Sequence, residues 1–257
     1  MSSTSGKLVI VNADDLGRTT GINSGIFEAH RKGLVTSATL MVAYPAAEEA
    51  AARLDEYPGL GVGLHVALTG SPSILPRERL PSLTDASGNC PAKPEELVHP
   101  VLDEVLMEAR AQFDRFLELT GRLPTHLDSH HHSHRHPVVC DALVALAREH
   151  DLPVRNASPD VEVRLRRDGV ATTDFFVERF FGDDARLDVL VEILKGIRPG
   201  VTEIMCHPAH VDDELRATSG YSDARDRELE VLTSPRALQA VQDLGLRPVH
   251  FGTACGS

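Results

Sequence analysis

Short apolar, β-branched segments alternate with helical segments along most of this chain, and this alternation is the feature that most limits its fold. Repeated strand-then-helix units favour a parallel sheet with right-handed crossovers. The sequence therefore predicts an α/β fold, namely a distorted (β/α) barrel of seven or eight mostly parallel strands, with an open doubly wound sheet as the second choice. The predicted strands cover residues 7–11, 37–42, 61–66, 125–129, 154–155, 201–206 and 248–252.

Helices are predicted between these strands, at residues 22–33, 45–58, 101–119, 137–149, 187–197, 226–232 and 235–244. In residues 157–185 the apolar residues follow neither the spacing of a helix nor the alternation of a strand clearly. Residues 69–100 are rich in Pro, Ser and Gly, which predicts a long loop excursion over the barrel mouth. We expect one domain over residues 1–257, because α/β barrels of this length commonly fold as a single unit.

Composition excludes several classes of protein. The net charge of -12 argues against binding to nucleic acid. No segment approaches the roughly 20 apolar residues that span a bilayer, and the apolar run near the start is too short for a signal peptide. We therefore expect a cytoplasmic protein without membrane contact. The four cysteines form no CxxC pair, which predicts reduced thiols.

Ionisable residues recur where the predicted strands end. In a barrel these positions meet at the face that carries the carboxyl ends of the strands, where catalytic sites are built. The residues concerned are Asn12, Asp14 and Asp15 after the first strand, His65, the group His126, Asp128 and His130, then Arg155 and His207.

The Asp14-Asp15 pair suits two different tasks. Adjacent aspartates point in different directions, so one can bind a cation while the other accepts a proton from bound water. A turn or a helix cap is the structural alternative, since Asp favours both.

The segment HLDSHHHSHRH holds six of the 13 histidines. If residues 125–130 are extended, His126, Asp128 and His130 share one face of the strand. Two or three imidazoles with a carboxylate suit zinc or another divalent ion, and Asp128 suits the task of orienting a ligand imidazole. A solvated polar loop, or a tract that binds metal adventitiously, is the alternative.

Two further histidines stand at predicted strand ends. His65 lies among small apolar neighbours in GVGLHVALT. It is predicted to be either a metal ligand or a buried, hydrogen-bonded side chain. His207 precedes Pro208, which cannot continue a central strand. A histidine there can act as a general acid toward a leaving nitrogen, or can be an ordinary loop residue.

Taken together, these segments resemble the YdjC-like carbohydrate deacetylase family, which includes chitooligosaccharide deacetylases. The resemblance covers nearly the whole chain. It is carried by VNADDLG, GIFEAHRKGLVTSAT, GLHVALT, GRLPTHLDSHHHSHRHP, MCHPAH and RDRELEVLTS.

The resemblance implies a distorted barrel that binds one divalent metal ion, Mg²⁺ or Zn²⁺, and removes acetyl groups from N-acetylated sugars. It implies Asp15, His65 and His130 as metal ligands, with Asp14 as the base and His207 as the acid. Arg155 matches an arginine that steadies Asp14 or binds substrate. The expected partner is a small carbohydrate, and a homodimer is left open.

Other functions remain open at this point. One is a metal hydrolase that acts on another amide or on a phosphoester, and another is a non-catalytic protein that binds metal or sugar. The sequence holds no GxSxG, P-loop or GxGxxG motif. His210 and residues 212–214 match no assignable pattern, and residues 70–100 match the family poorly, so the exact sugar is not predicted.

Overall fold

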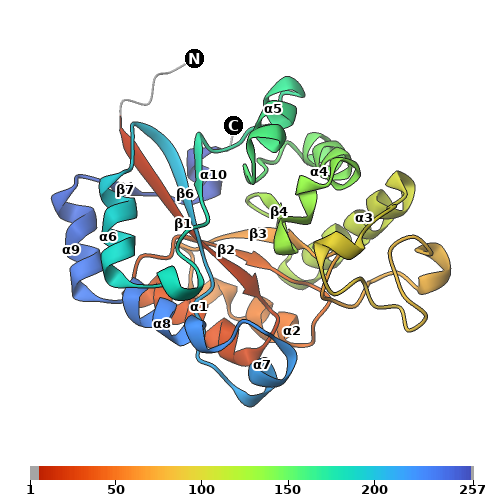
Figure 1. The fold of residues 1–257 in the computed structure, drawn as a ribbon, viewed down its shortest axis with the longest axis horizontal. Coiled ribbons are helices and arrows are strands. Elements are labelled where there is room, and N and C mark those ends of the chain that lie inside the picture. Colours follow the sequence, from red (N-terminus) through yellow and green to blue (C-terminus); the bar gives the residue numbers. More distant parts are fainter. Residues whose placement is uncertain (1–5, 256–257) are drawn as a thin grey trace.

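The computed structural model describes residues 6–255, and a parallel sheet forms its centre (Figure 1). Within this part of the chain the sheet has seven strands in the order β4-β3-β2-β1-β6-β5, with β7 also paired to β1. The strands are β1 (Lys7–Leu16), β2 (Ser37–Leu40), β3 (Gly61–Val66), β4 (Leu127–Ser129), β5 (Phe175–Val177), β6 (Gly200–Cys206) and β7 (Arg247–Pro248).

The sheet curls into a partial barrel, which confirms the predicted distorted barrel over the open sheet. Beyond β4, Val154 bridges Leu127, and the Arg155 amide donates to the Leu127 carbonyl at 3.0 Å. The predicted strand at 154–155 is therefore a single bridge. Arg155 then contacts Asp14 on β1 and Glu203 on β6 from across the barrel, which only a curled sheet permits. No ladder joins residues 154–155 to β5 in the described chain, so the barrel stays open there.

Helices surround the sheet and bury their apolar faces against it (Figure 1). Several begin as helix-capping rules predict, because Ser158 and Ser234 cap helices whose first residue is proline. The helices are α1 (Thr20–Lys32), α2 (Ala46–Ala52), α3 (Leu102–Thr120), α4 (Pro137–His150), α5 (Pro159–Arg167), α6 (Leu187–Lys195), α7 (Asp213–Thr218), α8 (Asp223–Leu232), α9 (Pro235–Asp243) and α10 (Phe251–Ala254). No helix in residues 6–255 has the length and apolar character needed to cross a bilayer.

Strand β1 is longer than predicted. It pairs with β6 as far as Ala13 and with β2 again at Leu16, with an irregularity between these positions. Asp15 stands in this irregularity with φ of 71°, a left-handed conformation that Asp tolerates better than most residues. Asp14 and Asp15 therefore lie within the carboxyl end of the strand, and the prediction that they follow it was wrong.

The inner face of the barrel changes from apolar to polar along its axis. Alternate residues of β1 point inward, so Leu8 and Ile10 contribute to the apolar floor while Asp14 lies above them. Phe251 completes the floor, and its ring stacks on that of His126 at 3.8 Å. The predicted strand at 248–252 was therefore largely wrong: the chain leaves the sheet after Pro248, and helix α10 carries Phe251 into the barrel.

Glycine is required on β3 to make room for this floor. A Cβ atom on Gly63 would lie 2.5 Å from the His126 ring, a distance that real Cβ atoms essentially never show. Gly63 thus allows His126 to lie inside the barrel, whereas Gly61 makes room for His250.

The stretch 157–185, which gave no clear prediction, contains α5 and β5. The excursion at 69–100 includes two short 3₁₀ turns, Arg77–Arg79 and Pro94–Glu96. The buried carboxylate of Glu108 on α3 accepts the backbone N–H groups of Ile74 and Leu75 at 2.8 and 3.0 Å. The loop is thereby attached to the body of the domain.

All four cysteines are free thiols.

Candidate metal centre and active site

Three buried side chains from three strand ends converge at the carboxyl face of the barrel: Asp15, His65 and His130. Asp15 Oδ1 lies 3.1 Å from His130 Nδ1 and 3.5 Å from His65 Nε2, and the two nitrogens are 3.3 Å apart. Ligand atoms roughly 2.0–2.2 Å from one ion at near-tetrahedral or octahedral angles are about 3.0–3.5 Å apart, so this triangle has the size of a metal site.

The chemistry of these atoms also fits a cation. Asp15 Oδ1 is buried and has no hydrogen-bond partner within residues 6–255, although a buried carboxylate oxygen is costly to leave unpaired. Two imidazoles and one carboxylate form a donor set suited to zinc or a similar divalent ion. The three side chains could therefore hold one metal ion with positions left open toward the cavity.

Asp128 orients His65. Its Oδ1 lies 2.6 Å from His65 Nδ1, and its Oδ2 accepts the Thr39 hydroxyl at 3.2 Å. Burial opposes a charged imidazole, but the Asp128 carboxylate outweighs it and raises the pKa of His65 to about 8. The Nδ1 hydrogen is thus directed to Asp128, which leaves the Nε2 atom facing Asp15 and His130.

Arg155 is fully buried and binds three carboxylates. Its two Nη atoms donate to the two oxygens of Asp14, each at 2.7 Å. It also contacts Asp128 Oδ2 at 2.9 Å and Glu203 Oε1 at 2.7 Å. Burial favours the protonated form of Asp14, but the Arg155 guanidinium outweighs it and holds the pKa of Asp14 well below its usual range.

The position of Arg155 decides between two possible metal groups. Asp14, His65 and Asp128 also offer ligand atoms within reach of one another. The guanidinium of Arg155 already occupies the space between Asp14 and Asp128 and pairs with both carboxylates. Only the Asp15–His65–His130 group keeps an unpaired carboxylate oxygen, so it is the better candidate.

His207 stands directly after β6, as predicted, and lines the same cavity. Its Nε2 lies 3.9 Å from Asp14 Oδ2. Burial lowers the pKa of His207 to about 4, and the Arg225 charge acts in the same direction. The imidazole is therefore neutral near pH 7 in this structure, whereas the sequence suggested an ordinary histidine that titrates near working pH.

Sequence reasoning missed two residues of helix α8 that reach the site. Arg225 donates to Asp15 Oδ2 at 2.5 Å, and buried Glu228 accepts the backbone N–H of His207 and the hydroxyl of Tyr221. Residues three apart lie on the same face of a helix, so one helix supports both Asp15 and His207. Both residues lie in the segment RDRELEVLTS, which is part of the family resemblance, but the sequence analysis assigned no function to this segment.

Of the six clustered histidines, only His130 joins the candidate metal group. Strand β4 ends at Ser129, and His130 starts a 3₁₀ turn, so the expected extended face stops one residue short. The others have separate surroundings: His126 lies in the floor, His131 and His132 line the cavity, His134 contacts the Ser129 hydroxyl, and His136 caps α4. His210 is half exposed and contacts Glu28.

A cavity of about 790 Å³ opens above the candidate metal group. Its walls carry charged, aromatic and small residues, a mixture typical of a site for a polar small molecule. Residues 70 and 92–95 of the 69–100 loop contribute to it. Lining residues outside the groups described above are Arg18, Gly70, residues 92–95, Glu178, Phe181, Met205 and residues 218–220.

Comparison with known families assigns the chain. The model of the family described as YdjC-like protein matches residues 8–243. The chain belongs to the YdjC-like family. Its YdjC-like relatives include proteins named carbohydrate deacetylase, from Brevibacillus brevis, and chitooligosaccharide deacetylase, from Yersinia pestis. The first is 40% identical over 95% of this chain and 98% of its own length, and the second is 39% identical over 95% and 98%.

A solved structure from Enterococcus faecalis V583 has the same fold as this YdjC-like chain. It superposes with a TM-score of 0.92 at 34% identity, and it covers 98% of this chain and 100% of its own. That protein is described provisionally as a cellobiose-phosphate cleavage protein. The similarity therefore extends over the whole barrel, including the strand ends that carry the candidate site.

Glu228, which supports His207 from helix α8, makes the free energy of unfolding depend on pH. Burial raises the pKa of Glu228 from 4.5 to about 7, although the Tyr221 hydroxyl and the His207 N–H act against this. Between these pH values the folded chain keeps a proton that the unfolded chain releases, so Glu228 makes the free energy of unfolding fall as pH rises from about 4.5 to about 7. Above the folded pKa the contribution levels off.

We predict that Glu228→Gln, which is neutral at every pH, loses this dependence. Relative to the unsubstituted chain, the variant should gain on the order of 3 kcal/mol between about pH 4.5 and 7. Urea unfolding of the two metal-free proteins across this range measures the difference. Glu230→Gln, at an exposed position of the same helix, is the control. A constant difference between Glu228→Gln and the unsubstituted chain at all pH values would contradict the prediction.

Proposed function

We propose that this YdjC-like chain is a carbohydrate deacetylase that hydrolyses the acetamide of an N-acetylated sugar to acetate and a free amino sugar. The observation that carries the proposal is the arrangement at the cavity floor. A metal-sized triangle of Asp15, His65 and His130 lies beside an ionised Asp14 and a neutral His207. The names of the relatives at 39–40% identity support the same reaction and a carbohydrate substrate.

Asp15, His65 and His130 would hold one divalent ion, with Zn²⁺ favoured by the two imidazoles and Mg²⁺ as the alternative. When bound, such an ion lowers the pKa of water and polarises a carbonyl group. The protein's part is to present its three ligand atoms in fixed positions. Asp128 fixes His65 and Arg225 fixes Asp15.

Asp14 is proposed as the general base. Its carboxylate remains ionised because Arg155 holds both oxygens, and it faces the cavity next to the candidate metal ligands. Asp14 accepts a proton from the attacking water, while Arg155 holds the carboxyl group in position. Arg155 is fully buried beneath Asp14, so its proposed role is to position the base and not to touch the sugar.

His207 is proposed as the general acid toward the leaving nitrogen. Its ring faces the cavity, with Nε2 on the side of Asp14. Because its pKa is about 4 in this structure, the imidazole is neutral until Asp14, whose Oδ2 lies 3.9 Å from His207 Nε2, passes to it the proton taken from the attacking water. His207 then delivers this proton to the amine as the C–N bond breaks, and both side chains return to their starting forms.

Two alternatives receive less support. A phosphoester hydrolase commonly uses two metal ions bridged by a carboxylate. In the described chain, the second group of metal-type side chains is already paired with Arg155. A purely binding protein has no need for a carboxylate and an imidazole placed beside an open metal position.

The proposed reaction predicts metal-dependent release of acetate. Purified protein should release acetate from N-acetylglucosamine oligomers, a chelator should abolish this activity, and added Zn²⁺ or Mg²⁺ should restore it. His130→Ala should lower the metal content, measured by elemental analysis, whereas His210→Ala should not, because His210 lies on the surface. Full activity of the metal-free protein would reject the metal's role, and release of phosphate without acetate would favour the phosphoesterase.

A second prediction separates proton transfer from metal binding. Asp14→Asn and His207→Ala should each lower kcat by about 10²- to 10⁴-fold, the usual scale of general acid-base catalysis. Both variants should keep the metal content and the substrate affinity, because neither side chain belongs to the candidate metal triangle. Asp213→Asn, at an exposed position, is the matched control. Loss of metal in His207→Ala would show that His207 is a ligand.

A further inference from the structure

The wall of the active-site cavity contains an aromatic ring with one open face. Phe181 lines this cavity and is 43% exposed, more than any other phenylalanine or tyrosine in residues 6–255. Its ring stacks on that of Tyr221, with the centroids 4.0 Å apart and the planes 13° apart. Because Tyr221 covers one face, the exposed surface of Phe181 belongs to its edges and its opposite face. An open aromatic face in a cavity wall is typical of a ligand-binding surface.

His207, the proposed general acid, lies beside this pair of rings. Its ring centroid is 5.4 Å from that of Phe181 and 5.6 Å from that of Tyr221, with interplanar angles of 71° and 72°. A ring at nearly equal distances from two stacked rings lies at their edges and not over an outer face. The outer face of Phe181 is therefore not covered by His207, and the imidazole lies at its border.

Helix α8 holds the stacked pair in place. The Tyr221 hydroxyl accepts the backbone N–H of Gly182 at 2.9 Å and donates to the buried carboxylate of Glu228. Gly182 directly follows Phe181, so the same hydroxyl fixes the backbone beside the open ring. The guanidinium of Arg225 lies over the Tyr221 ring, 5.3 Å from its centroid. The open face of Phe181 is thus fixed before a ligand binds, which lowers the entropy cost of binding.

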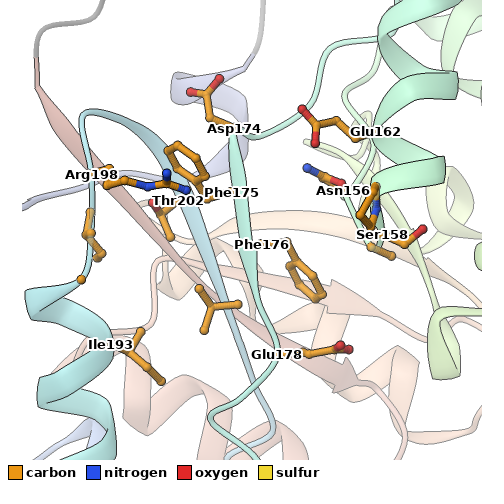
Figure 2. A pocket seen from close by; sticks show the side chains of 15 residues that line it. Asn156, Ser158, Glu162, Asp174, Phe175, Phe176, Glu178, Ile193, Arg198 and Thr202 are labelled. Atoms are coloured by element: carbon orange, nitrogen blue, oxygen red, sulfur yellow. The ribbon is translucent and has the colours of Figure 1, made fainter.

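The aromatic rings of the neighbouring cavity have a different environment. That cavity, of about 530 Å³, lies beside β5 and has Phe175 and Phe176 in its wall (Figure 2). The guanidinium of Arg198 lies 4.1 Å from the Phe175 centroid, and that of Arg155 lies 5.2 Å from the Phe176 centroid. Both rings therefore have a cation over one face. Phe175 serves below as a comparison for Phe181.

We propose that the sugar ring of the acetylated unit stacks on the open face of Phe181, and that this contact places the acetamide nitrogen at His207. The proposal rests on the deacetylase function proposed above and assigns the residue that orients its substrate. A pyranose ring has an apolar C–H face that can pack on an aromatic ring, and its substituents project from the edge. An acetamide at that edge can reach across Phe181 to His207 Nε2 and Asp14 Oδ2, which lie 3.9 Å apart. The alternative that it excludes is recognition of the acetamide alone.

Kinetics of two Phe181 variants test this proposal. Phe181→Leu keeps an apolar side chain but removes the flat ring, so it should lower kcat/KM for N-acetylglucosamine oligomers by about five- to tenfold. Phe181→Tyr keeps the ring and should stay within about twofold of the unsubstituted protein. Phe175→Leu is the matched control and should also stay within about twofold, because Phe175 lines the other cavity. Equal losses in Phe181→Leu and Phe181→Tyr, or no loss in either, would overturn the proposal.

A single tryptophan provides a measurement that does not depend on rate. The sequence contains no tryptophan, so Phe181→Trp introduces one fluorophore at the open face. In an Asp14→Asn background, a five-unit N-acetylglucosamine chain should change the tryptophan emission in a saturable manner. The half-saturation concentration should match the Kd that calorimetry gives for the doubly substituted protein. Phe175→Trp in the same background should keep its emission unchanged.

The outcomes separate this proposal from the proposed function. Calorimetric binding without a change in the Phe181→Trp emission would overturn the proposal, as would an equal change at positions 175 and 181. Absence of acetate release from every N-acetylated sugar by the unsubstituted, metal-loaded protein would instead refute the deacetylase function itself.

Discussion

The buried contacts of Arg155 are the interaction on which the rest of the site depends. One guanidinium holds Asp14, Asp128 and Glu203, which come from three different strands. A buried arginine is stable only when its donors are paired, and each carboxylate needs this cation in return. The network thus holds the curled sheet together at its centre. It also assigns the two aspartates of β1 to different tasks, because Arg155 occupies Asp14 and leaves Asp15 Oδ1 unpaired.

The charge balance of this centre favours a bound cation. Asp14, Asp15, Asp128 and Glu203 are buried together, and within residues 6–255 the arginines that form ion pairs with them are Arg155 and Arg225. Burial accordingly raises the pKa of Glu203 to about 7 despite its contact with Arg155. A divalent ion held by Asp15 and the two histidines would offset the excess negative charge, so folding and metal binding are expected to support each other.

Much of this arrangement could be predicted from the sequence because strand ends of a parallel sheet share one edge. Apolar runs such as residues 61–66 and 201–206 marked strands correctly, and the polar residues at their ends, including His65 and His207, line the same cavity. The extension of β1 could not be predicted, since Asp14 and Asp15 are extended only through pairing with β6 and β2. Arg225 reaches Asp15 across 210 residues, a contact that no local pattern encodes. Glu203 did leave a signal, as a lone carboxylate inside the apolar strand VTEIMC.

The central claim is that the two aspartates of β1 have separate partners, with Arg155 on Asp14 and a metal ion on Asp15. Anomalous diffraction from crystals grown with Zn²⁺ tests this claim most directly. We predict one strong peak about 2.0–2.2 Å from Asp15 Oδ1, His65 Nε2 and His130 Nδ1, with Arg155 still bound to Asp14. A peak between Asp14 and Asp128 with Arg155 displaced, or two peaks bridged by a carboxylate, would contradict the account.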